Sequence, residues 1–236
     1  MDNRFDAAVD ALSALRGDES SVAEPILGAM PVSGVSVSTI GTLLGTETVS
    51  ATDDRIARVD ELQFDLSEGP CWDALDSRSP VLEPDLQGNP QHSWPAFTKA
   101  ISGEEIAAIF AFPLLVGPLK IGAIDMYRTE PGTLSAEHQE QTLTLAGIIS
   151  RHVLRRAMLV AGRDADEGKE TPFSRRLVHQ ATGFVIAQLG VSPEDALLLI
   201  QGQAFAEGRS VHDVAGDIVS RRLRFSVEGN RIEDQR

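Results

Sequence analysis

Hydrophobic and polar residues alternate along the chain with two different periods. Between Phe5 and Leu15 apolar residues recur every three or four positions, which predicts an amphipathic helix over residues 4–16. The same spacing returns in residues 56–62, and Pro70 at a first turn predicts a further helix through Asp76. Runs with strand character predict strands at residues 35–39, 47–51, 80–84, 106–112 and 119–128. This part of the chain therefore mixes helices with strands.

The longest helical pattern begins at Ser135 and continues to Val160. Its apolar surface is wider than one face of a sheet needs, because residues beside the stripe that holds Ile149 and Val153 are also apolar. We therefore expect part of this helix to meet a second copy of the chain. The sequence predicts a homodimer through residues 135–160, with Ile149 and Val153 in the interface.

A charged segment from Gly162 to Pro172, with two glycines and a final proline, is typical of a linker. Three short helical patterns follow at residues 177–189, 193–207 and 211–219. Ser192 and Ser210 are suitable N-caps for the second and third. These patterns divide the chain into an N-terminal helix (1–19), an α+β domain that includes the long helix (20–162), a linker (163–173), a three-helix module (174–225) and a flexible tail (226–236).

Charge distinguishes the two main parts. The chain has 35 acidic and 21 basic residues, a net charge of -14, so its overall field does not attract nucleic acid or an anionic membrane. Residues 174–225 hold six basic and five acidic residues, against 13 and 27 in residues 1–173. The three-helix module is therefore relatively positive within an acidic protein.

The uncharged run from Pro25 to Thr46 is long enough to span a membrane, but glycine, proline and hydroxyl residues interrupt it. The N-terminus lacks the basic start and apolar stretch of a signal peptide. Cys71 is the only cysteine, which excludes an intramolecular disulfide and suits a reducing compartment. We expect a soluble, cytoplasmic protein that does not contact a membrane.

Catalytic and metal-binding signatures are absent from the sequence. It contains none of the patterns GxxxxGK(S/T), GxGxxG, GxSxG or HExxH, and its five histidines are not spaced as metal ligands. Cys71 and His92 would form a thiol and its base if they met in space, although packing is the simpler role for a lone cysteine. The sequence predicts that the protein is not an enzyme and has no metal site.

Five short segments occur in an order that resembles a GAF domain of the actinobacterial kind: GPCWDAL (69–75), PVLEPDL (80–86), SWPAF (93–97), FPLL (112–115) and GAIDMY (122–127). The resemblance covers roughly residues 20–160 and implies a sensory domain with an antiparallel sheet flanked by helices. No cofactor is expected, and a small-molecule ligand would be of unknown identity. Its pocket would be small and mostly apolar, lined by Cys71, Trp72, His92, Trp94, Phe110 and Phe112.

The module after the linker resembles an ANTAR domain. QATGFVI (180–186) stands where that family usually reads QAKGILM, with Thr182 in place of the lysine, and GRSVHDVAGDIV (208–219) matches its last helix. The resemblance implies a transcription antiterminator that binds an RNA hairpin and reaches RNA polymerase only indirectly. The candidate RNA-binding residues are Arg175, Arg176, Gln180, Thr182, Gly183, Arg209, His212 and Arg221.

Two other function classes remain open from the sequence. A DNA-binding regulator would use residues 206–210 as the turn of a helix-turn-helix motif, but Asp213 and Asp217 on the outward face of the last helix would repel phosphate. A protein that docks on a partner other than nucleic acid would use the same helices. The favoured interpretation is a signal-responsive transcription antiterminator, in which the GAF domain senses or dimerises.

Overall fold

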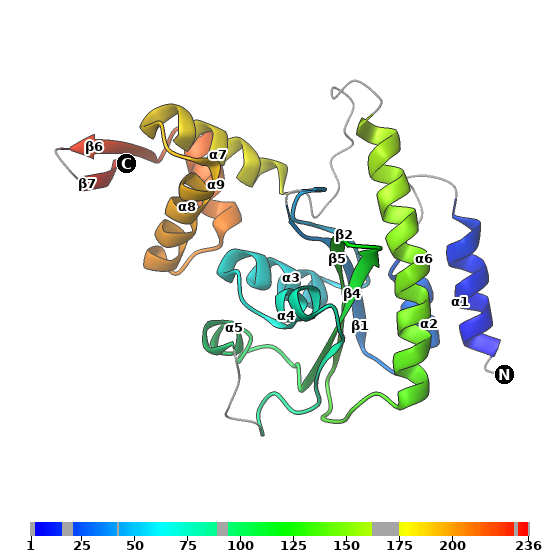
Figure 1. Cartoon of the computed structure of the whole chain (residues 1–236). Coiled ribbons are helices and arrows are strands. Elements are labelled where there is room, and N and C mark those ends of the chain that lie inside the picture. Colours follow the sequence, from blue (N-terminus) through cyan, green and yellow to red (C-terminus); the bar gives the residue numbers. More distant parts are fainter. Residues whose placement is uncertain are drawn as a thin grey trace. The chain divides into compact units, whose positions relative to one another are not determined.

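The structure is a computed structural model that describes residues 3–15, 21–41, 43–88, 94–161, 175–228 and 231–235. The chain divides into two compact units, residues 1–173 and residues 174–236, and each is described by itself (Figure 1).

A five-stranded antiparallel sheet is the centre of the first unit, with strand order β2-β1-β5-β4-β3. Gly117 and Pro118 form the turn that joins the two longest strands, and β5 lies in the middle of the sheet. The strands are β1 (Gly34–Thr39), β2 (Glu47–Ala51), β3 (Val81–Glu83), β4 (Ala108–Val116) and β5 (Leu119–Arg128).

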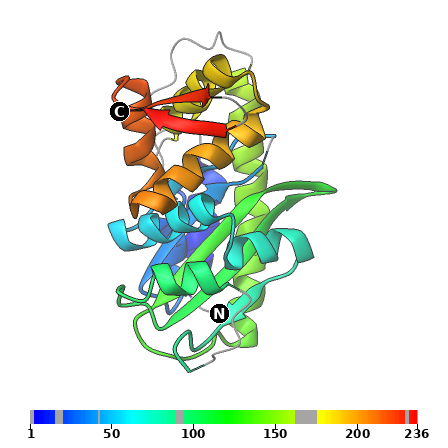
Figure 2. The ribbon, with the colours of Figure 1, turned by 90° about the vertical axis from the view of Figure 1, so that its left-hand side faces the viewer.

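Helices cover both faces of this sheet. Figure 2 views the unit from the side of α3 (Asp54–Leu66), α4 (Pro70–Ser77) and α5 (Pro95–Ala100), with α6 (Ala136–Ala161) behind the sheet. Side chains of alternate residues in β4 pack on opposite faces of the sheet. Phe110 and Phe112 belong to the core shared with α6, α1 (Asn3–Ala14) and α2 (Glu24–Ala29), whereas Ile109 packs with residues of α3 and α5. Because both faces are covered, the long strands are buried throughout most of their length.

The helices on the α3 side are fixed by local chemistry. The Asp53 carboxylate accepts a hydrogen bond from the Ile56 amide at 3.0 Å and caps α3. Gly69 precedes α4 with φ 140°, a conformation that favours glycine, and a Cβ there would stand 2.6 Å from the Gln63 side chain. Glu68 accepts from the amides of Ala96 and Phe97 at 2.8 and 3.1 Å, which ties the start of α5 to the end of α3.

Most predicted elements of the first unit are present, with a few differences. β4 runs over 108–116 rather than 106–112, and the sequence did not indicate α2 or α5, each of six residues. Ala8 and Leu12 of the N-terminal helix are buried in the same hydrophobic core as residues of α6. This helix is one of the layers that cover the sheet.

The expected positions of Ile149 and Val153 are wrong. These residues are 0 % and 5 % exposed and pack into the core beneath α6, because they face the sheet of their own unit. Among the side chains of α6 that the structure describes, the large apolar ones that are exposed are Leu143, at 44 %, and Met158, at 69 %. A homodimer through α6 stays a prediction, but its interface must use this other face.

The second unit begins with three helices, α7 (Arg176–Leu189), α8 (Pro193–Glu207) and α9 (Val211–Val219). Ser192 and Ser210 accept hydrogen bonds from the amides of Asp195 and Asp213, as their N-cap positions predicted. A hairpin of β6 (Arg224–Glu228) and β7 (Arg231–Gln235) follows, where the sequence predicted a flexible tail. The Phe225 amide donates to Gln188 Oε1 at 2.9 Å, so the hairpin is anchored on α7.

Candidate functional site

The exposed face of α7 brings together three of the candidate RNA-binding residues. Arg176, Gln180 and Gly183 stand at positions i, i+4 and i+7, and all three are exposed. A Cβ at Gly183 would meet nothing within 4 Å, so the surface there is open. Thr182 is half-buried, and its hydroxyl donates to the Val178 carbonyl at 2.8 Å within the same helix. It therefore lies beside this line of residues rather than on it.

Arg209 occupies a different environment, in an ion-pair network between α8 and α9. Its Nη1 lies 2.8 Å from a carboxylate oxygen of Glu207 and 2.8 Å from one of Asp217. Arg222 contacts Asp217 from the other side at 2.7 Å, and these two arginines lower the pKa of the Asp217 carboxyl. The charge of Arg209 is therefore already balanced by two carboxylates.

This network changes one step of the sequence argument. Asp217 was expected to present a free carboxylate on the outward face of α9, but its side chain is only 18 % exposed and lies between two arginines. Asp213 is exposed, and its carboxylate accepts from the Ser210 hydroxyl at 2.8 Å. The pairing escaped sequence reasoning because Arg209 and Asp217 lie in different elements, so no helical spacing indicates their contact.

The remaining candidates border these two groups. Arg175 is half-buried and directly precedes α7, while His212 is exposed in the first turn of α9. Arg221 follows α9, is exposed and adopts the left-handed conformation with φ 61°. Arg175 and Arg176 thus lie at the start of α7, about one turn before Gln180, whereas Arg209, His212 and Arg221 lie in or next to α9.

The outer face of α8 is apolar. Leu198 and Phe205, seven residues apart, are 65 % and 80 % exposed, and Gly202 between them is also exposed. Three acidic residues and no basic residue occur in this helix. A phosphate backbone would find no cation on α8.

The five predicted pocket residues that the structure describes do not lie together. Cys71, Trp72 and Trp94 belong to the α3 side of the sheet, whereas Phe110 and Phe112 are buried on the α6 side. His92 lies outside the described residues. A strand that is buried on both faces shows no polar alternation, so the sequence did not reveal that these phenylalanines face away from Cys71.

Cys71 occupies a packed position. Its side chain is fully buried, and burial raises the pKa of the thiol well above its ordinary value. Its amide donates to Gln63 Oε1 at 2.9 Å, and the Trp72 indole donates to the Gln63 carbonyl at 2.8 Å. Gln63 therefore fastens α4 to α3, and Cys71 fills the space between α4 and the sheet.

A pair of buried carboxyl groups lies beneath α3. Asp60 is 0 % exposed and accepts hydrogen bonds from the hydroxyls of Ser36 and Thr48, both at 2.8 Å. Its burial raises its pKa to about 7. Asp125, in the middle of β5, is also fully buried; burial and the charge of Asp60 raise its pKa well above the ordinary value.

Sequence reasoning missed this pair. Asp125 stands within the apolar run of GAIDMY. A carboxyl group inside a strand that is buried on both faces is the sequence feature that could have indicated this site. The arrangement can bind protons, because two carboxyl groups without a neighbouring cation cannot both be ionised at low cost. It lies on the opposite face of the sheet from α6.

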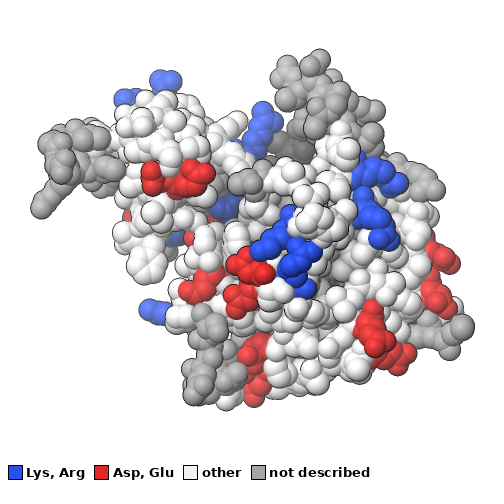
Figure 3. All heavy atoms as spheres, viewed as in Figure 1, with Lys and Arg blue, Asp and Glu red and all other residues white. Residues whose placement is uncertain are grey.

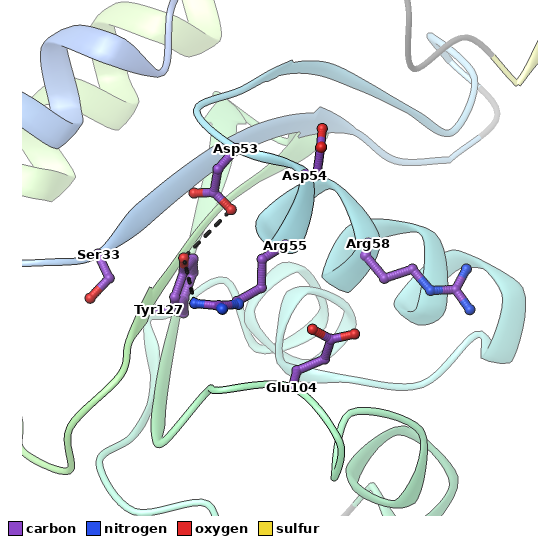
Figure 4. Close-up of a pocket in the computed structure, with 7 residues that line it drawn as sticks. All are labelled: Ser33, Asp53, Asp54, Arg55, Arg58, Glu104 and Tyr127. Carbon is purple, nitrogen blue, oxygen red and sulfur yellow. Dashed lines mark hydrogen bonds between the residues drawn. The ribbon is translucent and has the colours of Figure 1, made fainter.

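An open hollow of about 620 Å³ lies at the start of α3 (Figure 4). Arg55 lies over the Tyr127 ring, 5.6 Å from its centroid, and pairs with Glu105 at 2.7 Å, while the Tyr127 hydroxyl donates to Asp53 at 3.5 Å. Figure 4 shows Arg58 pointing away from this group; it pairs with Glu61 at 3.1 Å. Both arginines are already paired with glutamates, so the hollow offers no unpaired positive charge to an anion. The contacts of Arg55 and Tyr127 instead stabilise the start of α3. Its lining residues are Ser33, Asp53, Asp54, Arg55, Arg58, Glu104 and Tyr127.

The described part of the chain contains no group of three or more His, Cys, Asp or Glu side chains placed to hold a metal ion. No single helix there has the length and apolar composition to cross a membrane. The pair α7 and α8, which bend by 108° at their junction, meets that criterion together by length and composition alone.

Comparison with known proteins gives a family for each unit. The family model of the GAF domain matches residues 6–153, and that of the ANTAR domain matches residues 169–219. No curated protein gives a significant match.

Solved structures share the fold of the first unit. The GAF domain from an Acinetobacter phosphoenolpyruvate-protein phosphotransferase is 13 % identical, with a TM-score of 0.51, over 72 % of this chain and all of that one. The GAF domain of the Coxiella burnetii phosphotransferase is 13 % identical with a TM-score of 0.50, over 69 % and 95 % of the two chains. GAF and ANTAR are regulatory rather than catalytic domains, which places the chain among regulatory signalling proteins. The chain belongs to the GAF domain family and carries an ANTAR domain after its GAF domain.

Proposed function

We propose that this protein is a cytoplasmic, signal-responsive transcription antiterminator, in which the ANTAR domain binds an RNA hairpin and the GAF domain receives the signal. The match of residues 169–219 to the ANTAR domain carries the proposal. The relative charge of the second unit supports it, since residues 174–225 have a net charge of +1 within a chain of -14. RNA polymerase is affected indirectly, through the fold of the transcript.

The RNA contacts centre on the exposed face of α7. Arg176 binds phosphate or stacks on an unpaired base, and Gln180, one turn further on, offers both a donor and an acceptor to a base edge. Gly183 leaves room for the RNA to approach the helix backbone. Arg175, directly before α7, adds positive charge at the start of this face, and Arg221 adds positive charge after α9.

Arg209 positions α8 and α9 relative to each other. Its pairs with Glu207 and Asp217 fix the end of α8 against α9, so the arginine shapes the module and contributes little to phosphate binding. The two groups of arginines therefore have different roles, which mutation can separate.

Anisotropy of a labelled RNA hairpin, measured with the full chain at several salt concentrations, tests this proposal. We expect the double variant Arg176→Ala, Gln180→Ala to bind about tenfold more weakly and to lower the log-log salt slope by about 0.7 to 0.9, the value for one phosphate contact. Arg58→Ala, which removes a paired arginine of the GAF domain, is the matched control and leaves both quantities unchanged. Equal affinity of the wild type and the double variant would overturn the assignment of α7.

The same assay separates the two rival classes. Tighter binding of duplex DNA than of the hairpin would favour a helix-turn-helix regulator, which would have to use α9. The apolar face of α8, with Leu198 and Phe205 exposed, is the observation that favours docking on another protein. Binding of neither nucleic acid would support that alternative and refute the antiterminator.

We also propose that the protein is a homodimer through α6. Its supporting observation is the outward face of this helix, where Leu143 and Met158 are exposed. Sedimentation of the wild type at the mass of one chain at micromolar concentrations would refute the dimer.

A further inference from the structure

The outward face of α6 forms a continuous seam of exposed or half-buried residues. They recur at intervals of three and four, so they share one side of the helix. Arg151 lies along the surface of Gly147, since its Nη1 is 3.8 Å from where a Cβ on that glycine would stand. The seam residues are Glu137, Glu140, Thr144, Gly147, Arg151, Leu154 and Met158.

Charge divides this seam into two halves. Glu137 and Glu140 are exposed in the N-terminal half, and Arg151 and Arg155 are exposed in the C-terminal half. Figure 3 shows basic side chains over the upper part of α6 and acidic ones over its lower part and around α1, in the orientation of Figure 1. No ion pair of Glu137, Glu140 or Arg151 occurs among the described residues. The surface therefore presents opposite charges at its two ends.

We propose that two copies of the chain pair their α6 helices antiparallel, so that Glu140 of each lies opposite the partner's Arg151. This inference rests on the proposed homodimer and specifies its orientation and register. The two-fold axis then passes between Thr144 and Gly147, and Thr144 faces the partner's Gly147. These small residues let the helices approach closely at the centre, and the two Glu140 to Arg151 contacts flank it symmetrically.

The register also brings the first seam residue near a cation of the partner. Glu137 lies opposite the partner's Leu154 and beside its Arg155, which continues the charge match away from the axis. A parallel pair in register would place Glu140 against Glu140 and Arg151 against Arg151, with like charges facing along the seam. Charge complementarity therefore selects the antiparallel arrangement.

The orientation has a consequence for the ANTAR domains. With the axis near residue 145, each Ala161 lies about 23 Å from it along the helix at 1.5 Å per residue. The C-terminal ends of the two α6 helices then stand about 46 Å apart, at opposite ends of the pair. In an antiparallel dimer the connections to the two ANTAR domains therefore begin about 46 Å apart.

Disulfide crosslinking of the full chain tests the orientation. Cys71 is fully buried, so wild type is the uncrosslinked control. Glu140→Cys alone and Arg151→Cys alone should give no crosslinked dimer under oxidation, because each new thiol is about 16 Å from its copy along the helix pair. A mixture of the two variants after subunit exchange should give the crosslinked heterodimer. A crosslink of either variant with itself would establish a parallel pair and overturn the proposal.

Sedimentation of charge-reversed variants provides a second readout. Glu140→Arg places two arginines opposite each other and should weaken the dimer at least about tenfold, while the double variant Glu140→Arg, Arg151→Glu restores it. Lys99→Glu, on α5 at the other face of the sheet, is the charge-reversal control. Dimers that neither crosslink in the mixture nor respond to Glu140→Arg would refute this seam while leaving the homodimer intact, whereas a monomeric wild type would refute both.

Discussion

The buried carboxyl pair predicts an unusual dependence of stability on pH, which Asp60→Asn should abolish in part. Asp60 is completely buried, and its carboxyl accepts from two hydroxyls but faces no cation among the described residues. An asparagine there keeps an acceptor for Ser36 and reverses the hydrogen bond with Thr48, whose hydroxyl can accept as well as donate. The variant keeps the shape of the site and cannot ionise.

The magnitude follows from the pKa of Asp60. In the unfolded chain this carboxyl ionises near its ordinary pKa of 3.8, whereas burial raises its pKa to about 7 in the folded protein. Between these values the folded state holds a proton that the unfolded state has released, so the free energy of unfolding falls as pH rises. At about 1.4 kcal/mol for each pKa unit, the loss attributable to Asp60 is at most roughly 4 kcal/mol between pH 4 and pH 7.

Urea unfolding followed by tryptophan fluorescence measures this term. Trp72 and Trp94 are the only tryptophans and both lie in the GAF domain, so the signal reports on this unit alone. Between pH 5 and pH 8, the stability difference between the variant and the wild type should shift toward the variant by about 2 to 3 kcal/mol. Asp76→Asn, which changes an 80 % exposed carboxylate, is the control and should show no such shift. Parallel pH profiles for Asp60→Asn and wild type would show that burial of Asp60 does not perturb its ionisation.

Two further substitutions test the packing of each unit. Phe112→Ala should lower the unfolding free energy of the GAF domain by about 3 to 5 kcal/mol, because the ring is fully buried between the sheet and α6. The same fluorescence assay measures this change, and a loss below about 1 kcal/mol would contradict the assigned core. Ser210→Ala removes the N-cap of α9 and should cost about 0.5 to 2 kcal/mol, seen as a lower melting temperature of the ANTAR domain by circular dichroism, whereas Ser220→Ala after the helix should have a smaller effect.

Apolar periodicity and capping residues in the sequence were enough to predict most elements of the fold. The spacing of apolar residues predicts the three ANTAR helices. Gly190 and Gly208, which end the first two, have the positive φ that is typical of a glycine at a helix C-terminus. The short helices α2 and α5 escaped this reasoning because six residues give too little periodicity. Tertiary contacts hold α5 in particular, since Glu68 from the end of the α3 region caps its first amides.

The candidate sites were harder to predict from the sequence than the fold, because their chemistry depends on contacts between different helices and strands. The exposed line of Arg176, Gln180 and Gly183 follows from the spacing within one helix. The pairing of Arg209 with Asp217 does not, since it joins the α8–α9 connection to the far part of α9. The charge of Asp60 likewise affects Asp125 only when α3 packs on β5.

The position of the buried pair also constrains how the GAF domain can act on the rest of the chain. Asp125 faces α3, and its neighbours Ile124 and Met126 in β5 face the core beneath α6. A change in the charge or packing of the α3 side therefore reaches the α6 side across a single strand, through consecutive residues of β5. Because β5 is the central strand and is paired on both edges, its displacement would also move β1 and β4, and with them the surface on which α6 rests. In an antiparallel dimer such a displacement would act on the Glu140 to Arg151 contacts on both sides of the two-fold axis at once. A change on the α3 side of the GAF domain would thus reach the surface beneath α6 through the sheet.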